Sequence, residues 1–326
     1  QQQQQQQPQI PAGPPLPLAL MFPGQGSQYV SMLKTTKDIP AVRDMLDKAK
    51  EILGYDLLQL CLDGPEEKLG ETRFCQPALF VGGLAGVEKL RAEREEAVLR
   101  PQCVAGLSLG EYTALCFAGV LSFEDGLRLV KLRGEAMQEA AAVGKQCMVS
   151  IAGLDKATLD KLCLEAEKKE GAGAVCRVAN ALFPKGFACG GTEKAVLELQ
   201  EKALAAKALQ AKLLKTSGAF HTSLMLPAKE KLEKALKELA PKMKPPRIRV
   251  YLNVTAEPVE AGADPSKIVE LLGQQLVNPV LWEPTMKKMM DAGVKQFYEC
   301  GPQKQLKAMM KRINPTVWKE TYSIEV

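Results

Sequence analysis

The chain contains a single histidine, His221, among its 326 residues. Metal sites built from several imidazoles are therefore excluded, and only one imidazole is present for general-base chemistry near neutral pH. If a nucleophile in this protein is activated by an imidazole, that imidazole belongs to His221.

Cysteine is present but lacks the spacing of a metal site or a disulfide scaffold. The nine cysteines are an odd number and include no C-x-x-C pair. A zinc site of four cysteines needs closely spaced pairs, and disulfide scaffolds are short, cysteine-dense chains. We therefore expect buried thiols in a reducing compartment and no metal site.

Long apolar runs and a strong charge imbalance are also missing. The longest apolar candidate, Ala78–Val87, stops at Glu88 and is shorter than the roughly 18 to 20 residues that span a bilayer. The net charge of +5, from 43 basic and 38 acidic residues, is small for a nucleic-acid binder. A chain of this length that is 46% hydrophobic and 25% charged is typical of a soluble protein with about two domains, without a membrane or nucleic-acid partner.

The first seventeen residues, QQQQQQQPQIPAGPPLP, are rich in Gln and Pro and carry no charge. Such a composition buries too little apolar surface to order itself, so residues 1–17 are predicted to be disordered and outside the fold. They also lack the arginine of a transit peptide, and we expect the addressing segment of the protein to be absent from this sequence.

From Leu18 the pattern alternates between strands and helices. Apolar runs at Leu18–Phe22 and Cys103–Ala105 end in glycine-rich turns and predict buried strands. Helical periodicity follows each of them, and Ser122-Phe-Glu-Asp125 is a capping-box pattern that starts another helix. The predicted helices of this half are residues 41–53, 77–94, 111–118 and 122–142. This alternation predicts an α/β fold with a mainly parallel sheet.

Residues 144–213 differ in texture from the rest. Their pattern is strand, helix, strand, strand, helix and strand, which is the ferredoxin-like order. We therefore predict a small inserted ferredoxin-like subdomain, with residues 18–143 and 214–326 forming one hydrolase-like α/β core. The second part of this core has predicted strands at 248–252 and 296–299, a helix at 266–276 and a last helix from about Gln303.

Gly106-Leu-Ser108-Leu-Gly110 is a G-x-S-x-G pentapeptide, the pattern of a sharp turn that presents a serine nucleophile. Taken alone, a serine between glycines in a plain loop is the commoner explanation. A strand before it and a helix after it favour the nucleophile, because the N-terminus of that helix stabilises an oxyanion. The backbone N–H of Leu109 is then the first oxyanion donor.

A serine nucleophile needs a base, and His221 is the only imidazole available. A histidine beside Phe220 is more often structural than catalytic. Its uniqueness decides the matter: if Ser108 is activated by an imidazole, the fold must bring His221 to it.

Arg133 is the next anomaly, because it stands on an otherwise apolar helix face. That face consists of Leu129, Val130, Ala136, Met137 and Ala140. The common explanation is an arginine whose stem covers apolar surface while its head reaches water. The alternative is a guanidinium held in a pocket to bind a carboxylate through two hydrogen bonds.

Three further features are weaker. Gly24-Gln25-Gly26 is no dinucleotide fingerprint, because Tyr29 stands at the third glycine position, and no P-loop is present. Gln275 lies at a predicted helix end, where a buried glutamine is ordinarily structural. Two basic clusters are solvated faces or a docking site for an acidic partner: Lys242, Lys244, Arg247 and Arg249, and Lys304, Lys307, Lys311 and Arg312.

Seven motifs taken together resemble, in order and spacing, the malonyl-CoA:acyl carrier protein transacylase family. They are Phe22-Pro-Gly-Gln-Gly-Ser27, Gly106-Leu-Ser-Leu-Gly-Glu-Tyr112, Lys131-Leu-Arg-Gly-Glu-Ala-Met-Gln138, Ala219-Phe-His-Thr222, Asn253-Val, Gln275-Leu-Val-Asn-Pro-Val280 and Glu299-Cys-Gly-Pro302. The resemblance covers nearly everything from Leu18 onward, and residues 106–138 look most like the plastid form of plants and algae.

The resemblance implies roles for the catalytic groups. Ser108 accepts malonyl as an ester, and His221 deprotonates it and then protonates the departing thiolate. The backbone N–H groups of Gln25 and Leu109 form the oxyanion hole. Gln275 orients His221 in place of the acidic third member of a hydrolase triad.

The resemblance also implies substrate contacts. Arg133 pairs with the malonyl carboxylate, Met137 lines the same pocket, and Asn180 contacts substrate. The segment Ala179-Asn180-Ala-Leu182-Phe-Pro184-Lys-Gly186 departs from the bacterial pattern, because it lacks that pattern's second Asn and its Gln. Plastid relatives look similar at this leucine.

The implied activity is transfer of malonyl from CoA to the phosphopantetheine thiol of acyl carrier protein, for fatty acid synthesis. No cofactor is expected, since CoA and phosphopantetheine act as substrate carriers. The resemblance further implies a monomer in the plastid stroma, with the mitochondrion as the alternative. Two rival functions remain: a serine thioesterase or other hydrolase on acyl-CoA, and a non-enzymatic scaffold that docks a carrier protein.

Overall fold

The computed structural model describes residues 13–216 and 218–326. Residues 1–12 of the predicted disordered segment lie outside the described residues. The end of that segment needs correction, because strand β1 (Leu16–Phe22) already begins at Leu16. The Leu16 N–H donates to the Arg100 carbonyl oxygen at 2.7 Å, and Arg100 Nη2 donates to the Pro14 carbonyl oxygen at 2.7 Å. These bonds attach the chain to the sheet two residues earlier than its composition indicates.

The larger sheet has six strands in the order β11-β10-β1-β2-β7-β8, and all neighbours are parallel except β7 and β8. Alternate residues of β1 pack on opposite faces: Leu18 and Leu20 on one, Ala19 and Met21 on the other. A parallel strand that is buried on both faces needs such a continuous apolar run. The other strands are β2 (Pro101–Gly106), β7 (Arg249–Tyr251), β8 (Pro258–Val259), β10 (Gln296–Cys300) and β11 (Thr321–Ile324).

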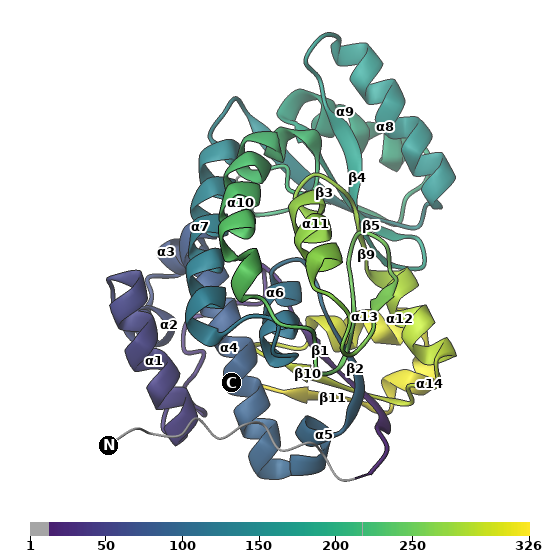
Figure 1. The fold of residues 1–326 in the computed structure, drawn as a ribbon. Coiled ribbons are helices and arrows are strands. Elements are labelled where there is room, and N and C mark those ends of the chain that lie inside the picture. Colours follow the sequence, from purple (N-terminus) through teal and green to yellow (C-terminus); the bar gives the residue numbers. More distant parts are fainter. Residues whose placement is uncertain (1–12, 217) are drawn as a thin grey trace.

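Helices cover both faces of this sheet (Figure 1). The larger apolar core lies on one side, against α1 (Pro40–Leu53), α4 (Thr72–Glu93), α6 (Leu109–Phe117), α7 (Phe123–Ala141), α10 (Leu226–Leu239) and α11 (Ser266–Gln275). A smaller core on the other side packs against α12 (Trp282–Asp291) and α13 (Gln305–Ile313). Short helices complete this part: α2 (Leu57–Asp63), α3 (Glu66–Gly70), α5 (Glu95–Leu99), α14 (Pro315–Trp318) and two 3₁₀ turns, Ser223–Met225 and Ala240–Lys242.

The second sheet has five strands in the order β6-β3-β5-β4-β9. Its first four strands and two helices follow the ferredoxin-like order: β3 (Gln146–Ala152), α8 (Lys156–Glu170), β4 (Cys176–Phe183), β5 (Gly186–Thr192), α9 (Glu193–Ala205) and β6 (Gln210–Leu213). This unit lies at one end of the molecule, teal in Figure 1. The α/β fold class with a small ferredoxin-like subdomain is confirmed.

The two sheets share one segment that the sequence pattern assigned wholly to the core. Strand β9 (Val280–Leu281) pairs in parallel with β4, with Asn180 opposite Val280. The Leu281 N–H also donates to the Asn253 carbonyl oxygen at 2.9 Å, so the same two residues connect the small sheet to the loop after β7. A two-residue strand carries no periodicity, which is why the sequence does not reveal it.

The prediction for the C-terminal end was incomplete. The expected last helix is α13, which begins at Gln305, but α14 and β11 follow it. Helix α4 also begins earlier than predicted, at Thr72, with Pro77 inside it. None of the helices within residues 13–216 and 218–326 combines the length and the apolarity needed to cross a bilayer.

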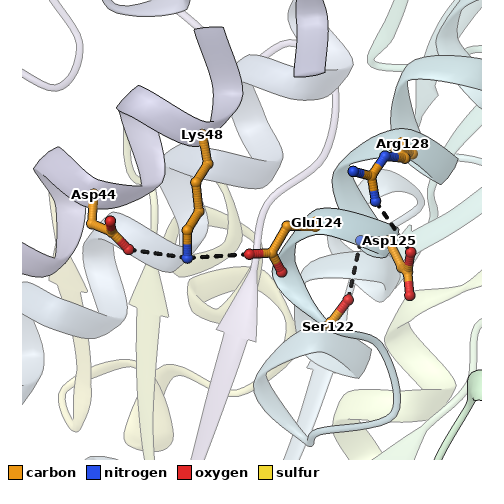
Figure 2. Close-up of polar contacts among 6 residues, drawn as sticks. All are labelled: Asp44, Lys48, Ser122, Glu124, Asp125 and Arg128. Carbon is orange, nitrogen blue, oxygen red and sulfur yellow. Dashed lines mark hydrogen bonds and ion pairs between the residues drawn. The ribbon is translucent and has the colours of Figure 1, made fainter. Parts of the chain in front are cut away.

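Helix α7, which carries Arg133 and Met137, starts as its sequence predicts. The Asp125 N–H donates to Ser122 Oγ at 3.1 Å, a side-chain cap that stabilises a helix by about 1 kcal/mol. Figure 2 shows this cap and the ion pairs beside it: Lys48 lies 3.1 Å from both Asp44 and Glu124, and joins α1 to the first turn of α7. The N-terminal end of α7 is thereby held against its neighbour.

Candidate active site

Ser108 sits on a strained turn between β2 and α6. Its φ is +54°, a region that residues other than glycine rarely adopt. A Cβ at Gly106 would overlap the Gly110 carbonyl oxygen, and a Cβ at Gly110 would overlap the Phe22 carbonyl oxygen. Glycine is therefore required on both sides of Ser108, as the pentapeptide predicts.

Asn253, just after β7, holds this turn from both ends. Its Oδ1 accepts the Ser108 N–H at 2.8 Å, and its Nδ2 donates to the Gly106 carbonyl oxygen at 2.7 Å. The Asn253 N–H in turn donates to Glu111 Oε2 at 2.6 Å. Burial raises the pKa of Glu111, while this N–H, the Gln275 amide and the Arg133 charge oppose the rise. The strain at Ser108 is thus supported by a buried polar network.

The structure brings His221 to Ser108. Ser108 Oγ lies 2.9 Å from His221 Nε2 across 113 residues of sequence. His221 Nδ1 lies 2.7 Å from the Gln275 carbonyl oxygen, which can only accept a hydrogen bond. The ring proton therefore resides on Nδ1, and Nε2 is free to accept the Ser108 hydroxyl proton.

Burial keeps the imidazole uncharged. His221 is 4% exposed, and burial lowers the pKa of its ring to about 4, with a smaller contribution from the Arg133 charge. The hydrogen bond to the Gln275 carbonyl acts in the opposite direction. At neutral pH the ring is therefore in the form that a general base needs.

Gln275 contacts His221 through its main-chain carbonyl. The resemblance implies a different contact, because the acidic member of a hydrolase triad orients the histidine with its side chain. The Gln275 amide group is engaged elsewhere: Oε1 accepts from Arg133 Nη2 at 2.8 Å, and Nε2 donates to the Ser108 carbonyl oxygen at 3.0 Å. The same Nε2 lies 3.2 Å from both Glu111 Oε1 and Asn253 Oδ1. The Gln275 side chain thus connects Arg133 with the network around Ser108.

Arg133 is fully buried, so the structure contradicts an arginine whose head reaches water. Its Nη1 donates to Gln76 Oε1 and its Nη2 lies 3.2 Å from Ser108 Oγ. Within the described residues no carboxylate lies within 4.0 Å of the guanidinium, and Arg133 Nε has no acceptor. A buried cation with neutral partners and an unused donor is suited to bind an anion.

The predicted oxyanion donors lie in the two loops that flank Ser108. Gln25 belongs to the loop after β1, and Leu109 is the first residue of α6. In the part of the chain that the structure describes, neither N–H donates to another residue. The Gln25 side chain is held by Thr72 and Gln76, whose amide Nε2 donates to Gln25 Oε1 at 3.2 Å.

A cavity of about 410 Å³ opens above Ser108, between the core and the small sheet. Ser108, His221, Gln25, Met137 and Asn180 all line it. Its remaining lining includes Met148, Leu182, Ala188, Leu214, Phe220, Gln305, Leu306 and Met309. Most of the predicted site residues are therefore gathered around one mostly apolar space. Arg133, Leu109 and Gln275 do not line it, but Arg133 and Gln275 contact Ser108 and Leu109 follows it in the chain.

Sequence reasoning assigned no role to four residues of this site: Gln76, Glu111, Asn253 and Gln305. Gln76 and Glu111 are each almost completely buried in an apolar stretch of helix. A polar residue that interrupts an apolar run is the available signal for both. Asn253 lies two residues after the end of a short strand, β7, which lies beside the end of β2, and this also marks it as a candidate.

The two basic clusters lie at different ends of the sheet. Arg249 begins β7, whereas Ser108 follows the carboxyl end of the neighbouring parallel strand β2. The cluster at 242–249 is therefore remote from the cavity. The second cluster lies on and just before α13, the helix whose residues Gln305, Leu306 and Met309 line the cavity.

Comparison with known proteins identifies relatives over most of the chain. The family described as "Acyl transferase domain" matches residues 20–317. A human protein, "Malonyl-CoA-acyl carrier protein transacylase, mitochondrial", is 42% identical over 94% of this chain and 80% of its own length. The crystal structure of an acyl carrier protein S-malonyltransferase from Vibrio cholerae is 37% identical, with a TM-score of 0.85 over 95% of this chain and 97% of that one.

A third match is a complex. It is described as a type II PKS acyl-carrier protein in complex with its malonyl-transacylase. The matched chain of that complex is 35% identical to this one, with a TM-score of 0.84 over 94% of both chains. The named relatives are mitochondrial and bacterial, and none of them supports the plastid type that the motifs suggest.

Proposed function

The chain belongs to the malonyl-CoA–acyl carrier protein transacylase family, and from this premise we propose how its own residues move malonyl from CoA to a carrier-protein thiol. Ser108 Oγ attacks the thioester carbonyl while His221 Nε2 takes the hydroxyl proton. The Gln25 and Leu109 N–H groups stabilise the tetrahedral oxyanion. As the carbon–sulfur bond breaks, His221 returns the proton to the CoA sulfur, leaving malonyl on Ser108.

The second half of the reaction repeats these steps in reverse. The phosphopantetheine thiol of the carrier protein gives its proton to His221 and attacks the Ser108 ester. The new thioester forms as the proton returns to Ser108 Oγ. Because one thioester is exchanged for another, the residues described need to supply only a nucleophile, a base and an oxyanion hole. We therefore propose that no metal or redox cofactor takes part.

The observation that carries this proposal is the position of Arg133. Its Nη2 is 3.2 Å from Ser108 Oγ, so an acyl chain attached to that oxygen lies against the guanidinium. A malonyl carboxylate supplies the anion that the buried cation lacks. A thioesterase for neutral acyl chains has no use for a cation here, which favours malonyl transfer over that rival.

Covalent labelling tests the proposed nucleophile. Incubation with malonyl-CoA and no acceptor is expected to add one malonyl group to the wild-type protein. The Ser108→Ala variant lacks the attacking oxygen and should gain none. Intact-protein mass spectrometry followed by peptide mapping measures both. Labelling of the alanine variant, or an unlabelled wild-type protein that only docks carrier protein, would contradict the mechanism and favour a scaffold.

The low pKa of His221 leads to a pH prediction. An imidazole with a pKa of about 4 is already neutral above pH 5, so its base function is lost only as the pH falls towards 4. The single-turnover rate of Ser108 acylation should therefore be nearly constant between pH 5 and 7. Rapid-quench measurement of CoA release gives this profile. An acylation rate that has already fallen to half its maximum at about pH 6.5 would show an ordinary imidazole pKa and contradict this prediction.

We propose that the carrier protein docks on the basic cluster of α13 and not on residues 242–249. The α13 cluster borders the cavity, so a phosphopantetheine arm can enter from there. Replacing Lys304 and Lys307 with Gln should raise the apparent KM for carrier protein several-fold, with an effect that shrinks at high salt. Lys242→Gln with Lys244→Gln is the matched control. An apparent KM that is indifferent to salt and to the α13 charges would refute this docking surface.

We propose that the protein is located in the mitochondrion. The human relative is mitochondrial, which supports the mitochondrion over the plastid stroma as the location. Antibody detection in fractionated cells of the source organism distinguishes the two.

We propose that the protein is a monomer. It takes malonyl-CoA and acyl carrier protein and has no nucleic-acid or membrane partners. Light scattering measures the oligomeric state.

A further inference from the structure

We propose that Gln305 is a positioning residue for the oxyanion hole. It holds the loop that carries the Gln25 N–H at the correct place relative to Ser108. This inference rests on the proposed function, because it concerns the rate at which malonyl reaches Ser108. It assigns a role to the Gln305 side chain, which takes no part in the steps of malonyl transfer or in carrier-protein docking.

Gln305 binds the oxyanion loop at two adjacent residues. Its Nε2 donates to the Gly26 carbonyl oxygen at 2.9 Å, and its Oε1 accepts from Ser27 Oγ at 3.2 Å. Gly26 and Ser27 are the two residues that follow Gln25, so both contacts lie close to the Gln25 N–H. In sequence, Ser27 is 278 residues away from Gln305. One amide group therefore ties the loop to the start of α13.

The loop needs an external support of this kind. Gly26 has a φ of +106°, and the atoms nearest to a Cβ built at Gly26 belong to Gln305. Within the loop the Gly26 N–H donates to the Gln28 side chain at 2.8 Å, but the bond from the Ser27 N–H to the Gly24 carbonyl oxygen is long, at 3.4 Å. A glycine-rich loop without ladder hydrogen bonds samples several conformations, and an oxyanion donor works only when it is preorganised.

Gln305 is itself held by a rigid anchor. Glu299, fully buried at the end of β10, accepts the N–H groups of the next two residues of α13: Leu306 at 3.0 Å and Lys307 at 2.9 Å. The carboxylate thus caps the N-terminus of α13 and ties it to the strand beside β1. Strand β1 leads directly into the oxyanion loop, so both sides of the Gln305 contact are fixed to neighbouring strands.

The alternative is that Gln305 touches the substrate directly, since it also lines the cavity. The two roles predict different kinetics. A positioning residue changes the rate of the chemical step and leaves the binding of malonyl-CoA unaltered, whereas a substrate contact weakens binding. Measurement of both quantities on the same variants separates them.

The experiment uses Gln305→Ala and Gln305→Glu. Glutamate keeps the length of the side chain but replaces the N–H donor with an oxygen that repels the Gly26 carbonyl. Each is compared with Gln59→Ala, the same substitution at an exposed position of α2. The single-turnover rate of Ser108 acylation is measured by rapid quench with malonyl-CoA. The Kd for malonyl-CoA is measured by calorimetry in a Ser108→Ala background, where no transfer occurs.

We expect both Gln305 variants to lower the acylation rate by about 10- to 100-fold, with a Kd within twofold of the parent. Ser27→Ala, which removes only one of the two contacts, should give a smaller loss. Rates within twofold of wild type, or a Kd that rises as much as the rate falls, would overturn the positioning role. Gln305→Glu serves alone if thermal melting shows that the alanine variant is unfolded. Failure of wild-type Ser108 to be acylated would instead refute the proposed function.

Discussion

Replacing His221 with alanine is expected to lower malonyl transfer by about 10⁴- to 10⁶-fold, because the pair of Ser108 and His221 acts as a unit. The 2.9 Å contact between Oγ and Nε2 is the only contact of Ser108 Oγ with a titratable base among the described residues. Without the imidazole, the hydroxyl proton has no acceptor in the attack, and the departing thiolate has no donor. Steady-state transfer to a carrier protein measures this loss.

The control for this variant follows from the backbone. His221 has a φ of +62°, where alanine is strained and asparagine is better tolerated. His221→Asn should therefore be as inactive as His221→Ala while it retains more thermal stability. An alanine variant with activity within tenfold of wild type would exclude imidazole base catalysis.

Chemical modification gives an independent test, since one imidazole is the only target in the chain. His221 is 4% exposed and lines the cavity, so a reagent must enter through the same opening as the substrate. Modification should thus be slow, and malonyl-CoA should protect against it. Full activity after complete modification would contradict the mechanism.

Replacing Arg133 with alanine is expected to lower malonyl transfer by about 10²- to 10⁴-fold, and acetyl transfer by much less. A carboxylate bound through two charge-assisted hydrogen bonds gains about 3–6 kcal/mol, and each 1.4 kcal/mol corresponds to tenfold in rate. An acetyl group has no carboxylate to lose this interaction. Acylation rates with malonyl-CoA and acetyl-CoA, measured on the same preparations, test the prediction.

Arg128→Ala is the matched control for this substitution. Arg128 lies on the same helix but points to solvent, where it pairs with Asp125 at 3.3 Å (Figure 2). Because Arg133 also donates to Gln76 and Gln275, its removal leaves buried acceptors unpaired and costs stability. Arg133→Lys retains the charge and tests whether the planar fork is needed. Equal losses with malonyl-CoA and acetyl-CoA would refute the carboxylate role.

Much of the site was predictable because its chemistry has a local signature. The two glycines around Ser108 are required by steric overlap within five residues, so the turn is visible in the pentapeptide itself. Arg133 was recognisable because a charge on an apolar helix face is costly unless it has a partner. Its burial and its contact with Ser108 agree with the pocket alternative and contradict the surface one.

The contacts of Gln275 show the limit of such reasoning. The family resemblance implied that this residue orients His221, but the structure assigns that contact to its main-chain carbonyl and the side chain to Arg133 and Asn253. A main-chain oxygen is present at every position and therefore leaves no mark in the sequence. Which carbonyl faces the imidazole depends only on how the end of α11 packs against the segment around His221.

The sequence by itself determined the alternation of strands and helices, the strained turn at Ser108 and the fact that only His221 can serve as its imidazole base. These follow from residue types and from spacings of a few residues. The tertiary structure alone decided that Gln76, Asn253 and Gln305 complete the site and that β9 joins the small sheet to the core. The hydrogen-bond partners of Gln76, Asn253 and Gln305 lie 57, 145 and 279 residues away in sequence. Hydrogen bonds over such separations depend on how strand ends and helix ends meet in space.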